Sequence, residues 1–305
     1  MSVLVVGSFV VDCVATCKRA PEAGETVVGD SYNTYLGGKG ANQAFAAIRM
    51  QSKTTMVGCI GNDGFGKQFL EVLNNEGFDT SYIKISNEHS TGVSLVTVEH
   101  SGQNRICMTP GANLDYTVED LNKLEELISN SDVIVTQLEM QYEIAAQLAR
   151  LAKKHHKKMI LNPAPARALD DEILDGLYCI TPNETELGII INKKIETMDE
   201  YIEGAKELLK KGCQNVIVTL GKTGSLLVNK DGSILVPAYI VKAIDTVGAG
   251  DSFTGSLSAM IEQGKSLKEA MEIATAVAAL EVQTKGAIPA MPYKEEVINF
   301  IGKKF

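Results

Sequence analysis

One pattern repeats along most of the sequence: a short, continuous apolar run followed by a longer amphipathic stretch. The first run is 3–6, which ends at Gly7, and runs like it are typical of strands buried on both faces. Further runs are 55–60, 133–136, 159–161, 178–180 and 216–220, and helical periodicity covers 65–76, 118–128, 144–155, 198–209, 251–263, 266–285 and 293–301. This alternation predicts an α/β fold, a three-layer αβα sandwich with a mostly parallel central sheet.

Two regions depart from this rhythm. Residues 12–37 and 91–108 contain short strand patterns without crossover helices, including a strand at 25–30 and a hairpin of 93–99 and 105–108 around Ser101 and Gly102. Strands without crossovers do not join a parallel sheet easily. We therefore expect a small β-subdomain that projects from the edge of the sheet and is assembled from both regions. No repeat or linker divides the chain, so 1–305 is predicted to be a single domain.

Composition excludes several classes of protein. Hydrophobic residues make up 45% and charged residues 22%, which is typical of a globular chain and not of a disordered one. The net charge of −9 argues against nucleic acid or an anionic membrane as the main partner. No apolar run approaches the ~18 residues of a membrane span, and the N-terminus lacks the pattern of a signal peptide. The six cysteines form no C-x-x-C pair and the four histidines have no metal-ligand spacing. We expect free thiols and a cytoplasmic location.

Small residues at 248–250 lead directly into the helical pattern that contains Asp251. The unpaired N–H groups at such a helix N-terminus form a site for an anion. An acidic residue in this first turn is either an ordinary capping residue or a base that takes a proton from a hydroxyl while the N–H groups hold a phosphoryl group.

Three other segments are candidates for ligand contact. In 36–44, glycines open a helix beside Lys39 and Asn42, which fits a ligand approached by backbone or a plain helix-opening turn. The segment 181–186 offers Asn183 and Glu186 after a strand, which fits an Mg²⁺-organising role or a capped helix start. The segment 219–224 suits approach to a nucleotide, although by itself it is no better than a glycine turn.

The segment 61–68 nearly matches the phosphate-binding P-loop. Gln68 replaces the Ser or Thr that would reach Mg²⁺, and Asp63 brings a negative charge to a position where a phosphate would sit. We therefore predict a turn before a helix there.

Taken in order, four segments resemble the ribokinase family, the PfkB-type carbohydrate kinases. They are 37–44, 162–167, 182–186 and 245–251, and the resemblance covers essentially the whole chain. It implies a ribokinase-like fold in which the β-subdomain is a lid and often a dimer contact, so we expect a homodimer. It also implies an ATP-dependent kinase that phosphorylates the 5-hydroxyl of a free pentose, D-ribose or 2-deoxy-D-ribose.

The resemblance further implies a role for each matching residue. Asp251 would be the general base, with the N–H groups of Gly248, Ala249 and Gly250 in the anion hole. The sugar would be held by Asp12, Gly38, Lys39, Asn42 and Glu139. ATP would contact Asn183, Thr219, Gly221, Gly224, Gly250 and Thr275, the last near adenine, and Glu186 would act on Mg²⁺ indirectly. An activating K⁺ would be held, largely by carbonyls, at Asp245, Val247, Glu281, Thr284, Gly286 and Ala290.

One position departs from the ribokinase pattern. Ribokinases carry an asparagine that binds a sugar hydroxyl where this chain has Val10, and the similar deoxyribokinases also have an apolar residue there. Either Val10 lets 2-deoxyribose be accepted at least as well as ribose, or it simply packs at the end of the first strand while water or a neighbouring group satisfies the hydroxyl. The alternatives to a pentose kinase are a kinase for another sugar or a nucleoside, and a non-catalytic sugar-binding regulator. A dinucleotide-dependent dehydrogenase is disfavoured, because no G-x-G-x-x-G follows the first strand.

Overall fold

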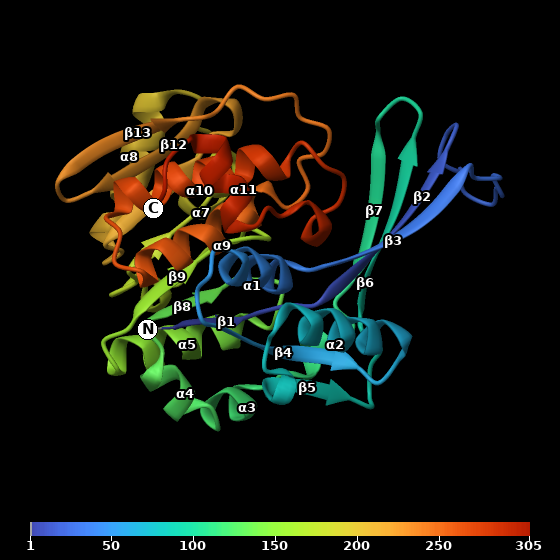
Figure 1. Cartoon of the computed structure of the whole chain (residues 1–305), viewed down its shortest axis with the longest axis horizontal. Coiled ribbons are helices and arrows are strands. Elements are labelled where there is room, and N and C mark those ends of the chain that lie inside the picture. Colours follow the sequence, from blue (N-terminus) through green and yellow to red (C-terminus); the bar gives the residue numbers. More distant parts are fainter. Residues whose placement is uncertain (1) are drawn as a thin grey trace.

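The computed structural model describes residues 2–305, and the larger of its two sheets has nine strands in this range (Figure 1). In spatial order the strands are β13 (Gly232–Pro237), β12 (Gly224–Asn229), β11 (Asn215–Thr219), β10 (Cys179–Ile180), β9 (Lys158–Leu161), β8 (Val133–Thr136), β1 (Val3–Val6), β4 (Thr54–Gly61) and β5 (Ile83–Ser86). Pairing is parallel from β11 to β5, and β12 and β13 complete one edge in antiparallel orientation. The mostly parallel sheet expected from the apolar runs is therefore present.

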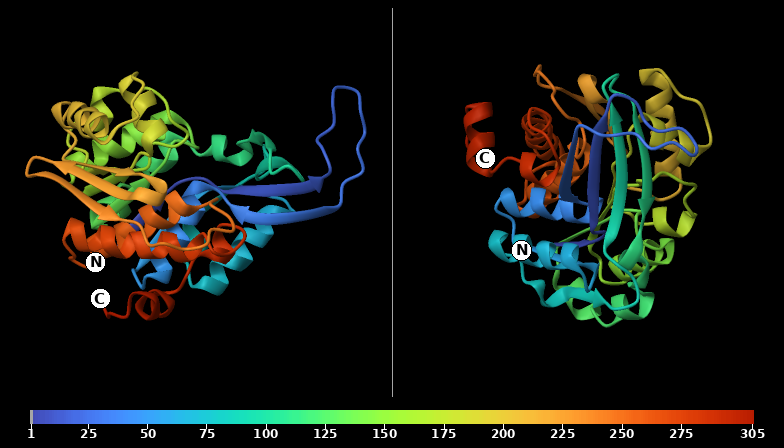
Figure 2. Two further views of the ribbon diagram at one scale, coloured as in Figure 1. Left: turned by 90° about the horizontal axis from the view of Figure 1, so that it is seen from above. Right: turned by 90° about the vertical axis from the view of Figure 1, so that its right-hand side faces the viewer.

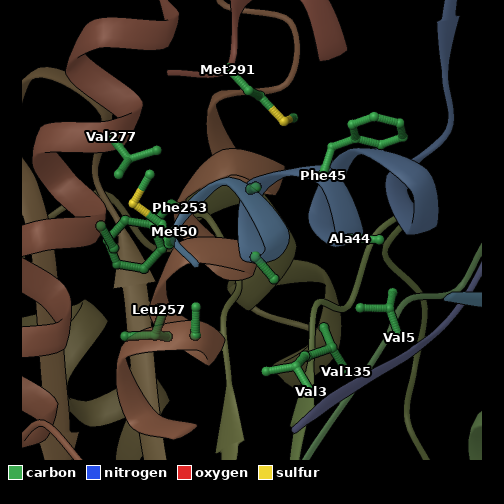
Figure 3. Packing of buried hydrophobic residues seen from close by; sticks show 14 of the residues in the cluster. Val3, Val5, Ala44, Phe45, Met50, Val135, Phe253, Leu257, Val277 and Met291 are labelled. Carbon is green, nitrogen blue, oxygen red and sulfur yellow. The ribbon is translucent and has the colours of Figure 1, made fainter. Parts of the chain in front are cut away.

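Helices cover both faces of this sheet. Successive side chains of a strand point to opposite faces, and in the core strands the side chains on both faces are apolar. In β1, Val3 and Val5 join one hydrophobic cluster, whereas Leu4 and Val6 join the other. The first cluster, part of which Figure 3 shows, lies under α1 (Lys39–Arg49), α2 (Gly64–Glu76), α9 (Ala249–Glu262), α10 (Leu267–Glu281) and α11 (Lys294–Ile301). The second lies under α3 (Val118–Asn122), α4 (Glu125–Asn130), α5 (Tyr142–Lys154), α6 (Asp171–Leu174), α7 (Glu184–Ile191) and α8 (Met198–Lys210). The fold is the expected three-layer sandwich.

A smaller, four-stranded sheet projects from the core (Figures 1 and 2). Its order is β3 (Ser31–Gly37), β2 (Val10–Cys17), β6 (Gly92–Glu99) and β7 (Asn104–Thr109). The hairpin predicted around Ser101 and Gly102 is the β6–β7 pair. The smaller sheet leaves the core at the carboxyl end of β1, since only three residues separate the end of β1 from the start of β2. It therefore lies over the ends of the core strands rather than beside an edge strand.

Two local predictions are wrong. Residues 25–30 form no strand and belong to the loop between β2 and β3, where Val28 is 91% exposed. Its β-branched residues had the propensity for a strand but no sheet to pack against. The helix predicted over 118–128 is interrupted between α3 and α4. Leu121 and Ile128 are both fully buried, so the periodicity marked a common face but not the interruption.

The turn predicted in place of a P-loop is present. Asp63 caps α2 by accepting a hydrogen bond from the Gly66 N–H, and it also accepts from the N–H and hydroxyl of Thr91. The Asp63 carboxylate thus accepts hydrogen bonds at the position where a P-loop would bind a phosphate. Within residues 2–305, the helices are too short or too polar to cross a membrane.

Candidate active site

The candidate site lies at the carboxyl ends of the parallel strands, where open α/β sheets bind their ligands. Polar residues follow several neighbouring strands directly: Ser8 after β1, Gln137 and Glu139 after β8, Asn162 after β9, and Asn183 after β10. The N-termini of α1 and α9 meet above them, and these two helices pack against each other.

Asp251 lies in the first turn of α9 and is 5% exposed. One carboxylate oxygen accepts from Asn42 Nδ2 at 2.9 Å, and the other accepts from Gln43 Nε2 at 2.9 Å. Lys39 Nζ lies 4.0 Å from the same oxygen as Gln43, and Asp251 is the main cause of the raised pKa of Lys39. The residue is not the helix cap, because that position is occupied by Gly248, with φ +94°. Asp251 is therefore a fixed acceptor beside a helix N-terminus.

A row of buried amides below Asp251 was not predicted from the sequence. Gln43, fully buried, donates to Asp251 and also to Asn162 Oδ1 at 3.3 Å, and it accepts from Gln137 Nε2 at 2.6 Å. Asn162 in turn donates to the carbonyl of Thr181. Gln43 and Asn162 lie inside segments that the sequence singled out. An amide side chain within such a motif is the signal that could have identified them.

The residues expected to hold the sugar come from the smaller sheet, from the start of α1 and from the segment after β8. The amide oxygen of Asn42 is buried and has no hydrogen-bond partner within the described residues. This oxygen and a carboxylate oxygen of Asp12 both lie 3.6 Å from the position that a Cβ on Gly37 would occupy. Burial raises the pKa of Asp12, which Ser94 counteracts by donating a hydrogen bond, and Glu139 and Asp245 raise it further.

Glu139 closes this group from the β8 side. It accepts from the Ser8 hydroxyl at 2.5 Å and from the backbone N–H of Lys39 at 2.9 Å. Burial raises the pKa of Glu139, whereas Lys39 and Ser8 act in the opposite direction. Ser8, which the sequence did not single out, also accepts from the N–H of Gly40 and so ties the start of α1 to the end of β1.

Val10 begins β2 directly beside the start of α1. It is 4% exposed and pairs with Gly37 and Gly92. Gly38 has φ +87°, and a Cβ there would lie 2.6 Å from the backbone nitrogen of Val10. This close approach requires glycine and holds the apolar Val10 next to a residue expected to hold the sugar.

The segments expected to bind nucleotide lie along the ends of β10 and β11. Asn183 caps α7 reciprocally with Glu186: each side chain accepts from the other's backbone N–H at 2.8 Å. The capped helix start is thus present. One carboxylate oxygen of Glu186 remains outside the cap, and burial raises the pKa of Glu186, which Lys39 counteracts. Asn183 also forms an isolated bridge with Thr219.

Gly221 begins a short 3₁₀ turn, η3 (Gly221–Thr223), and Gly224 follows it; both glycines have positive φ. A Cβ on Gly224 would collide with the carbonyl of Val236, so this turn requires glycine. Thr275 lies on α10, and its buried hydroxyl has no partner in the chain from residue 2 onward.

The residues expected around K⁺ gather where the loop before α9 meets the end of α10. Asp245 accepts from the N–H groups of Val247 and Gly286, each at 3.1 Å. Glu281 is the last residue of α10, and Thr284 donates to its carbonyl. Burial, with Asp245 and Asp251 nearby, raises the pKa of Glu281 to about 9. Ala290 ends the adjoining turn η4 (Ile288–Ala290).

The fold is that of a known class of protein. The model of the pfkB family carbohydrate kinases matches residues 1–294, and the chain belongs to that family.

Individual relatives are similar over nearly their whole length. A ribokinase of Schizosaccharomyces pombe is 37% identical over 97% of this chain and 96% of its own. A deoxyribokinase of Salmonella typhi is 35% identical over 99% of both chains. The structure of Arabidopsis thaliana ribokinase complexed with ribose and ATP matches with a TM-score of 0.93 and 32% identity, over 99% of both chains. The resemblance inferred from four segments is thus confirmed across the chain.

Proposed function

We propose that this protein is an ATP-dependent pentose kinase, a phosphotransferase with the sugar's 5-hydroxyl as acceptor. The observation that carries the proposal is Asp251, a buried carboxylate held by two amides beside the glycine-opened N-terminus of α9. The closely similar ribokinases and deoxyribokinase, and a neighbour with ribose and ATP, support the same activity.

Each group in the site has a role that phosphoryl transfer requires. Asp251 accepts the proton of the attacking hydroxyl. The N–H groups at 248–250 stabilise the negative charge on the transferred phosphoryl group, and Lys39 belongs to the residues that hold the sugar. Asn42 offers an unpartnered buried oxygen to a sugar hydroxyl, and Asp12 and Glu139 add two acceptors. A sugar carries several hydroxyl groups that can donate hydrogen bonds, so this set of acceptors suits a sugar substrate.

Measuring ADP release from ATP and Mg²⁺ with ribose or 2-deoxyribose tests this function. Asp251→Asn keeps the shape but removes the base, and we expect a loss of kcat of ~10²- to 10⁴-fold. Asp231→Asn, in the exposed turn between β12 and β13, is the matched control and should leave the rate unchanged. Pentose-independent ADP release, or full activity of Asp251→Asn, would contradict the proposal. Activity only with a nucleoside or another sugar would change the acceptor and retain the base.

We further propose that 2-deoxyribose is accepted at least as well as ribose, because of Val10. A valine cannot pair with a sugar hydroxyl, and a buried hydroxyl without its partner costs roughly 1–3 kcal/mol, about 5- to 150-fold in discrimination. In 2-deoxyribose that hydroxyl would be missing, and the apolar contact with Val10 would cost nothing.

The ratio of kcat/KM for the two sugars tests the role of Val10. Val10→Asn should raise kcat/KM for ribose relative to 2-deoxyribose by about 5-fold or more. Val11→Asn is not a suitable control because Val11 belongs to the core, so Val14→Asn, further along β2, is used. A strong preference for ribose that Val10→Asn does not alter would refute the assignment.

ATP as phosphoryl donor implies Mg²⁺ beside the phosphates, and the carboxylate Glu186 fits this role. The oxygen not used in the α7 cap can bind a water of the metal, since Mg²⁺ is usually held by one or two carboxylates together with waters and phosphates. Mg²⁺ would neutralise charge on the phosphates. Glu186→Gln is expected to raise the Mg²⁺ concentration needed for half-maximal activity, with a smaller effect on KM for the sugar.

We also propose K⁺ as an activating ion at Asp245, Val247, Glu281, Thr284, Gly286 and Ala290. Asp245 supports this role, because it orders both the loop before α9 and Gly286. Activity with K⁺ should exceed activity with choline at equal ionic strength, and equal activity would remove K⁺ from the proposal.

The smaller sheet is proposed as a lid that excludes water from the sugar, as phosphoryl transfer to a hydroxyl requires. By register, Asp12 and Met108 lie on one face, whereas Tyr32 and Leu95 lie on the other. Tyr32 and Leu95 are 63% and 58% exposed. Such an apolar outer face fits pairing with a second copy. Sedimentation should show a dimer that Leu95→Lys converts to monomer.

Since all six cysteines are free, we place the protein in the cytoplasm.

A further inference from the structure

Glu281 is the most unusual acid in the molecule. Its side chain is fully buried at the end of α10, and neither carboxylate oxygen has a hydrogen-bond partner among residues 2–305. Burial of an acid normally requires a partner, because an unpaired buried polar group costs several kcal/mol. Glu262, at the end of the neighbouring helix α9, is also buried, but it accepts a hydrogen bond from Ser52.

The side chain of Glu281 points towards the entrance of the proposed anion hole. One of its oxygens lies 2.9 Å from the position that a Cβ on Gly248 would occupy, and Ala287 borders the same space. The charged groups that act on Glu281 are the carboxylates of Asp245 and Asp251. The carboxyl end of α10 adds the partial negative charge of its free carbonyls. Glu281 is thus an unpartnered acid in a surrounding that is already negative.

A cation is the group that these surroundings lack. Carboxylate and carbonyl oxygens are the ligands of hard cations, and Glu281, Asp245 and the carbonyls of 284–290 supply both. Neither carboxylate oxygen of Glu281 has a donor among the described residues, and a cation is the partner that would satisfy both. No lysine or arginine supplies one among the interactions of Glu281 in the described chain.

We propose that the carboxylate of Glu281 is itself a ligand of the cation beside α9, so that two side-chain carboxylates and not carbonyls alone hold the ion. This inference relies on the proposed function for the location of the cation. It does not depend on the identity of the sugar or on the reaction. With a second negative charge the ion is bound more tightly and becomes part of the folded structure. Cation binding then stabilises the protein by mass action.

Thermal unfolding measures this without reference to activity. The wild type, Glu281→Gln and the control Glu262→Gln are unfolded at one pH, in choline chloride with choline replaced stepwise by KCl at constant ionic strength. We expect KCl to raise the Tm of the wild type and of Glu262→Gln. In Glu281→Gln, the KCl concentration for half of the rise should increase by ~10-fold or more, because the lost attraction at close range is of that order.

Glu281→Ala provides the second variant, and keeps the backbone carbonyl. If carbonyls alone hold the ion, both variants will respond to KCl like the wild type, and the proposal is wrong. The absence of any K⁺ response in the wild type also overturns it. A kinase assay on the same samples separates the two claims: an inactive protein with the expected pattern of Tm values would refute the kinase and support the carboxylate ligand.

Discussion

Replacing Gln43 by methionine tests whether the buried amides below Asp251 position the base. Methionine has a similar length and shape but neither donates nor accepts a strong hydrogen bond. The substitution therefore removes the hydrogen bonds to Asp251 and Asn162 and leaves the Gln137 amide without its acceptor. Asn42 still donates to Asp251, so the carboxylate keeps one of its two amide partners.

The expected size of the effect follows from these contacts. A hydrogen bond to a charged group contributes about 1.5–3 kcal/mol, and an amide left unsatisfied costs about 1–3 kcal/mol. Because both effects share one site, we expect a loss of ~3–5 kcal/mol in the free energy of unfolding. With one amide missing, Asp251 can rotate away from the sugar, and a small misplacement of a base costs ~10- to 100-fold in kcat.

Urea unfolding and steady-state kinetics measure the two effects. The KM for the sugar should change much less than kcat, since Gln43 acts through Asp251 and not on the substrate. Gln68→Met, at an exposed position of α2, controls for the substitution itself. A variant with wild-type stability and kcat would refute the reasoning, and a variant in which only the KM for the sugar changed would place Gln43 in the binding site instead.

Three further substitutions address how the site is supported. Arg49→Ala breaks a largely buried pair with Glu76 and removes donors to the carbonyls of Ile288 and Met291, and urea unfolding should show a loss of about 3–5 kcal/mol; a loss below about 1 kcal/mol would contradict the anchoring role. Gly224→Ala, at φ +115° against a carbonyl of β13, should lower stability by more than about 1 kcal/mol and raise KM for ATP. Asp63→Asn should cost about 1–2 kcal/mol at neutral pH. Burial raises the pKa of Asp63, but amide and hydroxyl donors outweigh it, so the pKa lies below the usual 3.8 and the stabilisation is lost as the pH falls through that lowered value. A difference between the two proteins that does not shrink as the pH falls below 3.8 would be inconsistent with this.

The sequence predicted the core elements well because burial leaves a local signal. The run at 3–6 is apolar at every position, and 133–136 is apolar except at Thr136, because both faces of these strands are covered. The same signal fails at 25–30, where propensity without a neighbouring strand gives a loop. The antiparallel β12–β13 edge was not predicted, because neither 224–229 nor 232–237 was recognised as a strand; the short turn that joins them sets their direction.

The site was predicted residue by residue through motifs, but not its contacts. The hydrogen bond between Gln43 and Asp251 spans 208 positions, and no local pattern reports such a separation. Asn183 and Glu186 illustrate another limit: the capped helix start and the metal role use the same residue types at the same spacing. The unpartnered oxygens of Glu281 became visible only when the surroundings of α10 were known.

The way in which β2 and β6 leave the core has a consequence for how this protein can vary. β2 and β3 diverge from the paired residues Val10 and Gly37, and β6 and β7 from Val93 and Thr109, so each excursion begins and ends at one place. The strand order of the core is independent of both excursions. The loop at 18–30, which extends far from the core in Figure 2, can therefore be shortened or lengthened at little entropic cost and without shifting the register of β1. Size and shape of the projecting part can change separately from the chemistry at α9.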